Sequence, residues 1–133
     1  MTITTKHKVH FYDTDTMSVV HHSNYIRWFE IGRVEYLRKI GISLNDLMAD
    51  GILFPITKVE AQFHSPAHFD DDLDIITTAV ALTKAKMEFD YEIRRGDKLL
   101  VTGHTQNVFT SKSTGKITRL PDKYYSLMNS HSI

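Results

Sequence analysis

The sequence HFYDTDTMSVVHHSNYIRWFEIGRVEYLRKI, residues 10–40, joins a loop with two carboxylates to one long apolar helix. After Ser23 or Asn24, both acceptable N-cap residues, apolar or small side chains recur every three or four positions, which is the repeat of one helical face. These residues are Tyr25, Phe29, Gly32, Tyr36 and Ile40. Because further apolar residues flank this row, the helix is expected to be surrounded by other structure and to end at Gly41.

The rest of the chain has the pattern of strands joined by tight turns. Strands are expected at residues 3–11, 52–63, 69–82, 87–94 and 99–109, with short helices at 43–49 and 121–128. The β-branched run in 69–82 predicts a strand that is covered on both sides. Successive hairpins favour an antiparallel sheet, and a single long helix must fill its core. The sequence therefore predicts an α+β fold, with a five-stranded curved antiparallel sheet wrapped around one long central helix.

Small residues in the strands would let such a sheet curl closely around the helix; they are Ala61, Ala79, Ala81 and Gly103. A five-stranded curved sheet also leaves two edges, and pairing with a second copy is a common way to remove them. We therefore expect a homodimer or a homotetramer.

Composition limits the possible functions. The 133 residues are expected to form one domain, 1–133, with a real hydrophobic core. Lys plus Arg and Asp plus Glu both number 16, so no overall basic charge favours nucleic acid or an anionic membrane. The absence of cysteine excludes disulfides, thiolate metal sites and a cysteine nucleophile. With no apolar run of secretory or membrane-spanning length, a cytoplasmic protein without membrane insertion is expected.

Two carboxylates, Asp13 and Asp15, stand just before the helix. In a bare Asp-x-Asp pattern such residues often only form turns or caps. A calcium loop that starts at Asp13 would need glycine at its sixth position and glutamate at its twelfth, and the chain has Ser18 and Asn24 there. His7 and His10 are three apart on an expected strand, which would send them to opposite faces. No metal site is therefore predicted.

The motifs around this loop closely resemble those of hotdog-fold acyl-CoA thioesterases of the 4-hydroxybenzoyl-CoA thioesterase type. They are Phe11-Tyr12-Asp13-Thr14-Asp15, Val19-Val20-His21-His22-Ser23-Asn24-Tyr25, Trp28-Phe29-Glu30, Ser65-Pro66-Ala67, Phe69-Asp70-Asp71, Leu73 and Leu120-Pro121. The resemblance covers nearly the whole chain and implies a hotdog fold, thioester hydrolysis and a site shared between subunits. It places Asp15 on the catalytic carboxylate and Asp13 on a structural one. Many members have a glycine where this chain has Ser18.

The chemistry can also be argued from the residues. A thioester has a good leaving group, so its hydrolysis needs a carboxylate that activates water or attacks directly, together with donors for the developing oxyanion. A helix N-terminus offers free N–H groups and a positive dipole end. A loop that folds back would bring Asp15 near the amides around His22 and Ser23. The predicted function is hydrolysis of acyl-CoA, and the alternative is a non-catalytic protein that binds acyl-CoA or acyl-carrier protein.

The resemblance also suggests residues that bind substrate. Lys84 and Lys86 flank a tight turn where similar proteins carry basic residues that meet the phosphates of coenzyme A, although lysines at turns are usually only solvated. Phe54 and Pro55 would line the acyl site across a dimer. His22 would bind the thioester, orient the loop or pack near the helix start, and Tyr25 would serve as core and pocket wall. No cofactor is expected, and the acyl group stays open.

Overall fold

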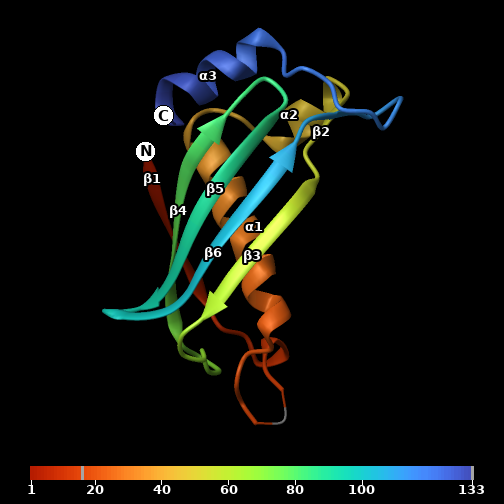
Figure 1. The fold of residues 1–133 in the computed structure, drawn as a ribbon. Helices are drawn as coiled ribbons and strands as arrows, with labels where there is room; N and C mark the ends of the chain where they lie inside the picture. Colours follow the sequence, from red (N-terminus) through yellow and green to blue (C-terminus); the bar gives the residue numbers. More distant parts are fainter. Residues whose placement is uncertain (16, 133) are drawn as a thin grey trace.

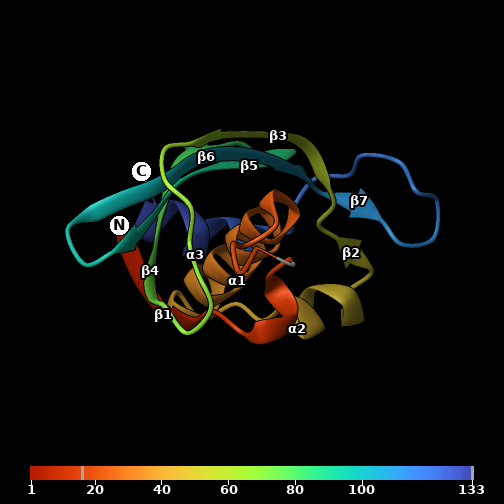
Figure 2. The ribbon, with the colours of Figure 1, turned by 90° about the horizontal axis from the view of Figure 1, so that it is seen from below.

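The computed structural model describes residues 1–15 and 17–132, and its centre is one sheet folded over one helix. The five strands lie in the order β1 (Thr2–Lys8), β4 (Asp72–Leu82), β5 (Lys86–Arg95), β6 (Lys98–Val108) and β3 (Ile56–Phe63). Every neighbouring pair is antiparallel. Helix α1 (His22–Lys39) lies behind the sheet in Figure 1, and Figure 2 shows the sheet arched over it. The predicted α+β fold is confirmed.

Smaller elements complete the chain. A 3₁₀ helix, η1 (Phe11–Asp13), precedes α1, and α2 (Leu44–Ala49) follows it. The Ser43 hydroxyl accepts a hydrogen bond of 3.0 Å from the Asp46 N–H, as expected of an N-cap. Strands β2 (Ile52–Leu53) and β7 (Thr110–Ser111) form a separate small sheet, and α3 (Asp122–Ser132) ends the described chain.

Close contact between α1 and the sheet depends on two glycines. A Cβ added to Gly103 would lie 2.2 Å from the Phe29 ring, and one added to Gly32 would lie 2.2 Å from the Thr77 Oγ1. Phe29 is fully buried and stacks on Tyr91, with ring centroids 4.5 Å apart. The predicted helical row is buried throughout, and of the predicted small strand residues Gly103 is the one whose missing side chain makes room for the helix.

The start of α1 differs from the prediction. The N-cap is His21 instead of Ser23 or Asn24, because the His21 Nδ1 accepts a hydrogen bond of 3.2 Å from the Ser23 N–H. A neutral imidazole can accept at one nitrogen, so it replaces the usual hydroxyl or amide oxygen. The end agrees with the prediction, since Ile40 is the C-cap and Gly41 has a φ of 95°.

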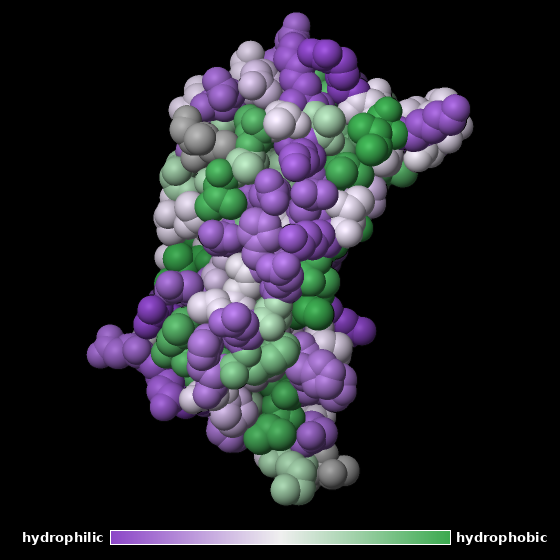
Figure 3. Space-filling view, viewed as in Figure 1, coloured by the Kyte–Doolittle hydropathy of each residue, from purple (hydrophilic) through white to green (hydrophobic). Residues whose placement is uncertain are grey.

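Three strand boundaries were also wrong. The first strand ends at Lys8, because the chain turns into η1. Pro55 divides the second expected strand into β2 and β3. The third expected strand begins only at Asp72, because residues 68–71 form a turn. Burial alternates along β4, so only one of its faces is fully covered in this chain. Figure 3 shows hydrophilic side chains gathered over the middle of the outer sheet face.

No helix in the described part of the chain is long and apolar enough to cross a membrane.

Candidate active site

A cleft of about 410 Å³ lies at the start of α1. Three segments surround it: the loop between η1 and α1, the first turn of α1, and the end of β3 with the residues after it. The lining residues are Asp15, Val19, Val20, His21, His22, Tyr25, Phe63, His64, Ser65 and Pro66. The structure thus brings together three of the predicted site residues, Asp15, His22 and Tyr25.

The loop that carries Asp15 closes on itself. The Asp15 N–H donates to the Val19 carbonyl at 3.0 Å, and the Ser18 N–H donates to the Asp15 carbonyl at 3.1 Å. Ser18 has a φ of 62°, a left-handed conformation that glycine adopts without strain. The serine therefore adopts the backbone conformation that a glycine would adopt. Its presence is no reason to expect that the loop is distorted.

The Asp15 side chain is exposed to the cleft. Its Oδ1 accepts a hydrogen bond of 2.7 Å from the Met17 N–H, which fixes the side chain against its own loop. No hydrogen bond or ion pair to the other oxygen, Oδ2, is found among the described residues. One carboxylate oxygen therefore remains open to a water molecule or a substrate.

Asp13 has a different environment. It is only 6% exposed, and its Oδ2 accepts a hydrogen bond of 3.0 Å from the His10 N–H. Its carbonyl accepts from the Asn24 Nδ2 at 2.9 Å and from the His21 N–H at 3.2 Å. These bonds attach the loop to the first turn of α1, so Asp13 has the surroundings of a structural residue.

The first turn of α1 offers fewer free amides than expected. The Ser23 N–H is already bonded to the His21 imidazole, and the Asn24 N–H donates to the His21 carbonyl at 3.0 Å. Within residues 1–15 and 17–132, no acceptor takes the His22 N–H. Of the two predicted oxyanion donors, the structure leaves the His22 amide available, and Ser23 is not part of the cleft lining.

Tyr25 forms the wall between the cleft and the core. Its hydroxyl accepts a hydrogen bond of 2.9 Å from the Ala67 N–H, and its ring lies 5.5 Å from that of Phe63. Burial raises the pKa of the Tyr25 hydroxyl, while the bond from Ala67 opposes this effect. The tyrosine is therefore neutral near pH 7 and serves to position the 63–67 segment.

Sequence reasoning assigned no site role to His21, His64 or Phe63. The His22 ring stacks on that of His21, with centroids 4.2 Å apart, and lies 6.0 Å from the Phe63 ring. The His64 Nε2 lies 3.4 Å from the Thr102 Oγ1 at the other side of the cleft. The Ser65-Pro66 motif was the one available signal, because it marks the end of β3 beside the cleft.

The segment before β3 and the β4–β5 turn, which carry the remaining predicted residues, lie at the end of the sheet opposite the start of α1 (Figure 1). The Phe54 ring stacks on Phe109 at 5.0 Å, and the Pro55 carbonyl accepts from the Val108 N–H at 3.0 Å. The Lys84 Nζ lies 2.7 Å from the Asp122 Oδ1, and Lys86 begins β5. One chain alone does not bring these four residues to the cleft.

The separation of His7 and His10 onto opposite faces was wrong. His10 lies beyond the end of β1 as the N-cap of η1, so the parity of a strand does not apply to it. The two imidazole rings are 5.6 Å apart and both face Asp13.

Comparison with known proteins agrees with this architecture. The model of the thioesterase-like superfamily matches residues 9–127, and the chain belongs to this family. The acyl-CoA thioester hydrolase YbgC of Escherichia coli is 31% identical over 94 residues, which cover 71% of this chain and 70% of YbgC.

Solved structures show the same fold. The hypothetical protein TT1821 of Thermus thermophilus aligns with a TM-score of 0.93 and 28% identity, over 100% of this chain and 99% of that one. The DHNA-CoA thioesterase of Staphylococcus aureus aligns with a TM-score of 0.89 and 26% identity, over 97% of this chain and 91% of its own. The predicted hotdog fold, family and thioesterase class are confirmed, and the roles of individual residues remain predictions.

Proposed function

We propose that the cleft hydrolyses acyl-CoA thioesters to a free acid and coenzyme A, with Asp15 as general base or nucleophile. The observation that carries this proposal is the position of an exposed Asp15 carboxylate in one cleft with the His22 N–H at a helix start, which no acceptor among the described residues takes. The carboxylate can act on the carbonyl carbon of the thioester, and the N–H can donate a hydrogen bond to the carbonyl oxygen. Both components come from one short segment of chain.

The reaction needs little more than these two groups. In the general-base route, Asp15 takes a proton from water while the water oxygen attacks the thioester carbon. The carbonyl oxygen gains negative charge, which the His22 N–H and the positive end of the α1 dipole stabilise. The intermediate then expels the coenzyme A thiolate, which needs no strong acid because a thiol is far more acidic than an alcohol; the thiol of cysteine, for comparison, has a pKa of about 8.5. In the nucleophilic route, the carboxylate attacks the same carbon and displaces the coenzyme A thiolate, and water then cleaves the resulting anhydride to the free acid and the regenerated Asp15.

The other predicted residues fit an assembly of two chains. β3 is an edge of the sheet, and much of it is exposed in this chain. If two copies pair antiparallel through β3, the start of one β3 meets the end of the other. Phe54 and Pro55, just before β3, would then lie near the partner copy's cleft wall. The Lys84–Lys86 turn is at the same end of the sheet, since the Phe109 N–H bonds the Ala85 carbonyl at 2.9 Å. A homodimer or homotetramer would thus complete the acyl and phosphate contacts.

Thiol release from a panel of acyl-CoAs tests the catalytic assignment. Asp15→Asn keeps the size of the side chain but removes its basicity, so kcat is expected to fall by about 10²- to 10⁴-fold. Asp97→Asn is the matched control, because Asp97 is exposed in the β5–β6 turn and does not line the cleft. Equal rates for wild type and Asp15→Asn would reject the role of Asp15. Tight binding without turnover across the panel would indicate a non-catalytic binding protein.

A second pair of measurements tests the shared site. Lys84→Gln and Lys86→Gln are expected to raise KM for an acyl-CoA and to leave KM unchanged for the same acyl group on pantetheine, which lacks the nucleotide phosphates. Sedimentation of the wild type reports the oligomeric state directly. A monomer with full activity would contradict the assembly.

A further inference from the structure

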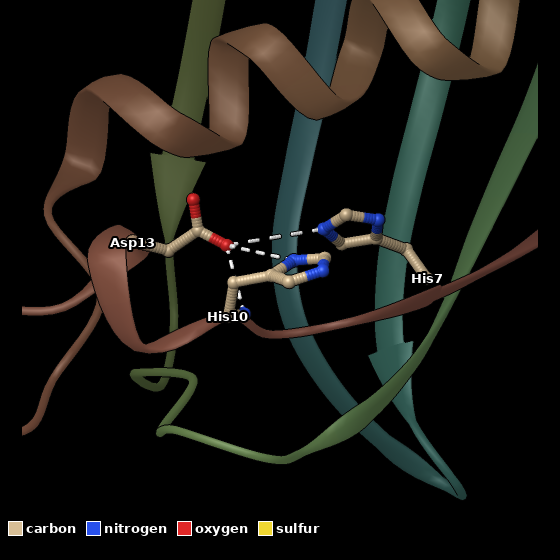
Figure 4. Close-up of side chains that lie close together, drawn as sticks. All are labelled: His7, His10 and Asp13. Carbon is tan, nitrogen blue, oxygen red and sulfur yellow. Dashed lines mark hydrogen bonds and ion pairs between the residues drawn. The ribbon is translucent and has the colours of Figure 1, made fainter.

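A cluster of metal-ligating atoms lies just outside the cleft, where β1 passes into η1 (Figure 4). His7 comes from the end of β1, His10 caps η1, and Asp13 is the last residue of η1. The His7 Nε2 is 4.0 Å and the His10 Nδ1 is 3.8 Å from the same oxygen, the Asp13 Oδ2. All three ligand atoms lie within 4.8 Å of one another.

These separations are too long for hydrogen bonds, which leaves the two imidazoles facing a carboxylate without bonding to it. The clearest sign is the His7 Nε2, which is buried and has no hydrogen-bond partner among the residues that the structure describes. A buried polar atom without a partner is costly, and native structures rarely contain one unless a water molecule or an ion completes it. The Trp28 ring, 5.1 Å from the His7 ring, helps to hold the imidazole in this orientation.

The donor set fits one class of ion. Two imidazole nitrogens and one carboxylate oxygen suit divalent first-row transition metals, whereas calcium and magnesium prefer oxygen ligands alone. Around a tetrahedral zinc ion with bonds of about 2.0–2.1 Å, ligand atoms lie about 3.4 Å apart. The observed spacing of 3.8 Å to at most 4.8 Å would need to contract by about 0.4–1.4 Å, which rotation of the half-exposed His10 side chain can supply. We propose that His7 Nε2, His10 Nδ1 and Asp13 Oδ2 bind a divalent transition-metal ion of the zinc type.

Two further features favour binding. Burial lowers the pKa of the His7 imidazole, an effect that Asp13 opposes and His10 reinforces, so the neutral form that a metal requires prevails near pH 7. The exposed side of His10 leaves an entry path and a position for a water ligand. None of the three ligands lines the cleft as the described residues define it. The ion therefore has a structural role instead of a place in the thioester reaction.

The structural role follows from the bonds of Asp13. Its carbonyl holds the Asn24 side chain and the His21 N–H at the start of α1, and Asp15 is two residues further along. A metal that joins His7 to Asp13 would therefore tie the end of β1 to the loop that carries Asp15. The metal proposal stands whether or not Asp15 is catalytic.

Cobalt(II) binding to the chelator-treated full-length protein tests the site. Four-coordinate cobalt absorbs strongly in the visible range, and a paramagnetic ion beside His7 should quench the fluorescence of Trp28, the one tryptophan in the chain. We expect one ion per chain with both signals. His7→Gln and His10→Gln should each weaken binding by at least about tenfold, since even loss of an outer-shell partner costs 10- to 100-fold.

His68→Gln is the matched control. His68 also lies 3.8 Å from an aspartate three residues later, and it is about as exposed as His10, but it belongs to a different turn. The control should bind cobalt like the wild type, and circular dichroism checks that each variant is folded. Equal binding by the wild type and the folded His10→Gln variant would overturn the proposal, as would a spectrum of octahedral cobalt or no binding in the micromolar range.

Discussion

Two turns of this protein share one pattern of hydrogen bonds and differ in the group that faces the aspartate. Residues 10–13 read His-Phe-Tyr-Asp and residues 68–71 read His-Phe-Asp-Asp. In each turn the histidine N–H donates to the aspartate Oδ2, at 3.0 and 2.9 Å, and the histidine Nδ1 lies 3.8 Å from that oxygen. In each turn the aspartate N–H also donates a hydrogen bond to the histidine carbonyl, at 3.0 and 3.1 Å.

The third group near each aspartate comes from elsewhere in the chain. The Asp71 Oδ2 accepts a hydrogen bond of 2.7 Å from the Arg95 Nη1, whereas the Asp13 Oδ2 faces the His7 imidazole at 4.0 Å. Arginine stays charged at every accessible pH and closes the second turn as an ion pair. Histidine is a metal ligand and a weak base, so it leaves the first turn open to an ion. The local sequence thus determines the backbone of the turn. The distant residue, Arg95 or His7, determines whether the aspartate forms an ion pair or stays available to a metal ion.

The largest expected difference between the turns is their response to zinc. With zinc at about one hundred times its dissociation constant, binding to the folded state alone adds about 2.7 kcal/mol to the free energy of unfolding. Asp71→Ala should keep this gain and Asp13→Ala should lose it. Urea unfolding with and without zinc measures the gain within each variant, so the cost of the substitution itself cancels. An equal gain in both variants would remove the distinction between the turns.

The helix and the strands were readable from the sequence because they depend on local repeats, whereas the strand order was not predicted, since β3 pairs with β6 and not with the strand that follows it. The row Tyr25, Phe29, Gly32 and Tyr36 follows helical spacing, and it is the face that packs inside the sheet. The turn at 10–13 was missed, although its His-x-x-Asp pattern is local, because the alternation of residues 3–11 was extended through it. His21 was missed as the N-cap because histidine is an unusual choice there.

The second turn should respond to acid through Arg95. Burial acts to raise the pKa of Asp71, but the His68 N–H and the Arg95 guanidinium together lower it below its ordinary value. A lowered pKa in the folded state contributes stability above the unfolded value of 3.8, and this contribution is lost as the pH falls through the folded pKa.

Arg95→Met should therefore cost about 0.5–1 kcal/mol near pH 7, since both groups are partly exposed, and the cost should shrink below about pH 4. Urea unfolding at pH 7, 5 and 3 checks this. Lys98→Met removes an equal charge from an exposed position in the same hairpin and serves as control. A cost that does not change with pH would mean that Arg95 acts through packing alone.

The cleft itself could be predicted only in part. Asp15 and His22 are close in sequence, so the resemblance and the chemistry of a helix start were sufficient to place them together. Phe63 and His64 reach the cleft only because β3 runs antiparallel to β6 and ends beside α1. The bond of Asp71 to Arg95, 24 residues away, likewise depends on a tertiary pairing, that of β4 with β5.

The turns also contact each other, through Phe11 and Phe69. Their rings meet edge to face with centroids 5.4 Å apart, and both are largely exposed. A double-mutant cycle with Phe11→Ala and Phe69→Ala should give a coupling energy of about 0.5 kcal/mol, the low end for aromatic pairs because water competes at this surface. A coupling near zero would show that this ring pair adds nothing to the backbone bonds between Val9 and residues 70–71.

The smallest expected effect concerns left-handed backbone near each turn. Asp70, inside the second turn, has a φ of 71°, and Ser18, in the loop after the first, has a φ of 62°. Aspartate tolerates this conformation better than serine does, and Asp70 also lies 3.6 Å from the Lys8 ammonium. Ser18→Gly removes backbone strain in the folded state but gives the unfolded chain more freedom. The free energy of unfolding should therefore rise by only about 0.3 kcal/mol. Asp70→Gly should not raise it.

Thermal unfolding can separate these two outcomes, because 0.3 kcal/mol corresponds to a rise in Tm of about 1 °C for a chain of this size. Ser18→Ala is the control, since it removes the hydroxyl and keeps the strain, and it should not raise Tm. If Ser18→Gly lowers Tm while thiol release is unchanged, the serine side chain stabilises the loop by more than its backbone strain costs. If Asp70→Gly raises Tm as much as Ser18→Gly does, the backbone of Asp70 is as strained as that of Ser18. The two turns would then differ only in the residue that faces the aspartate.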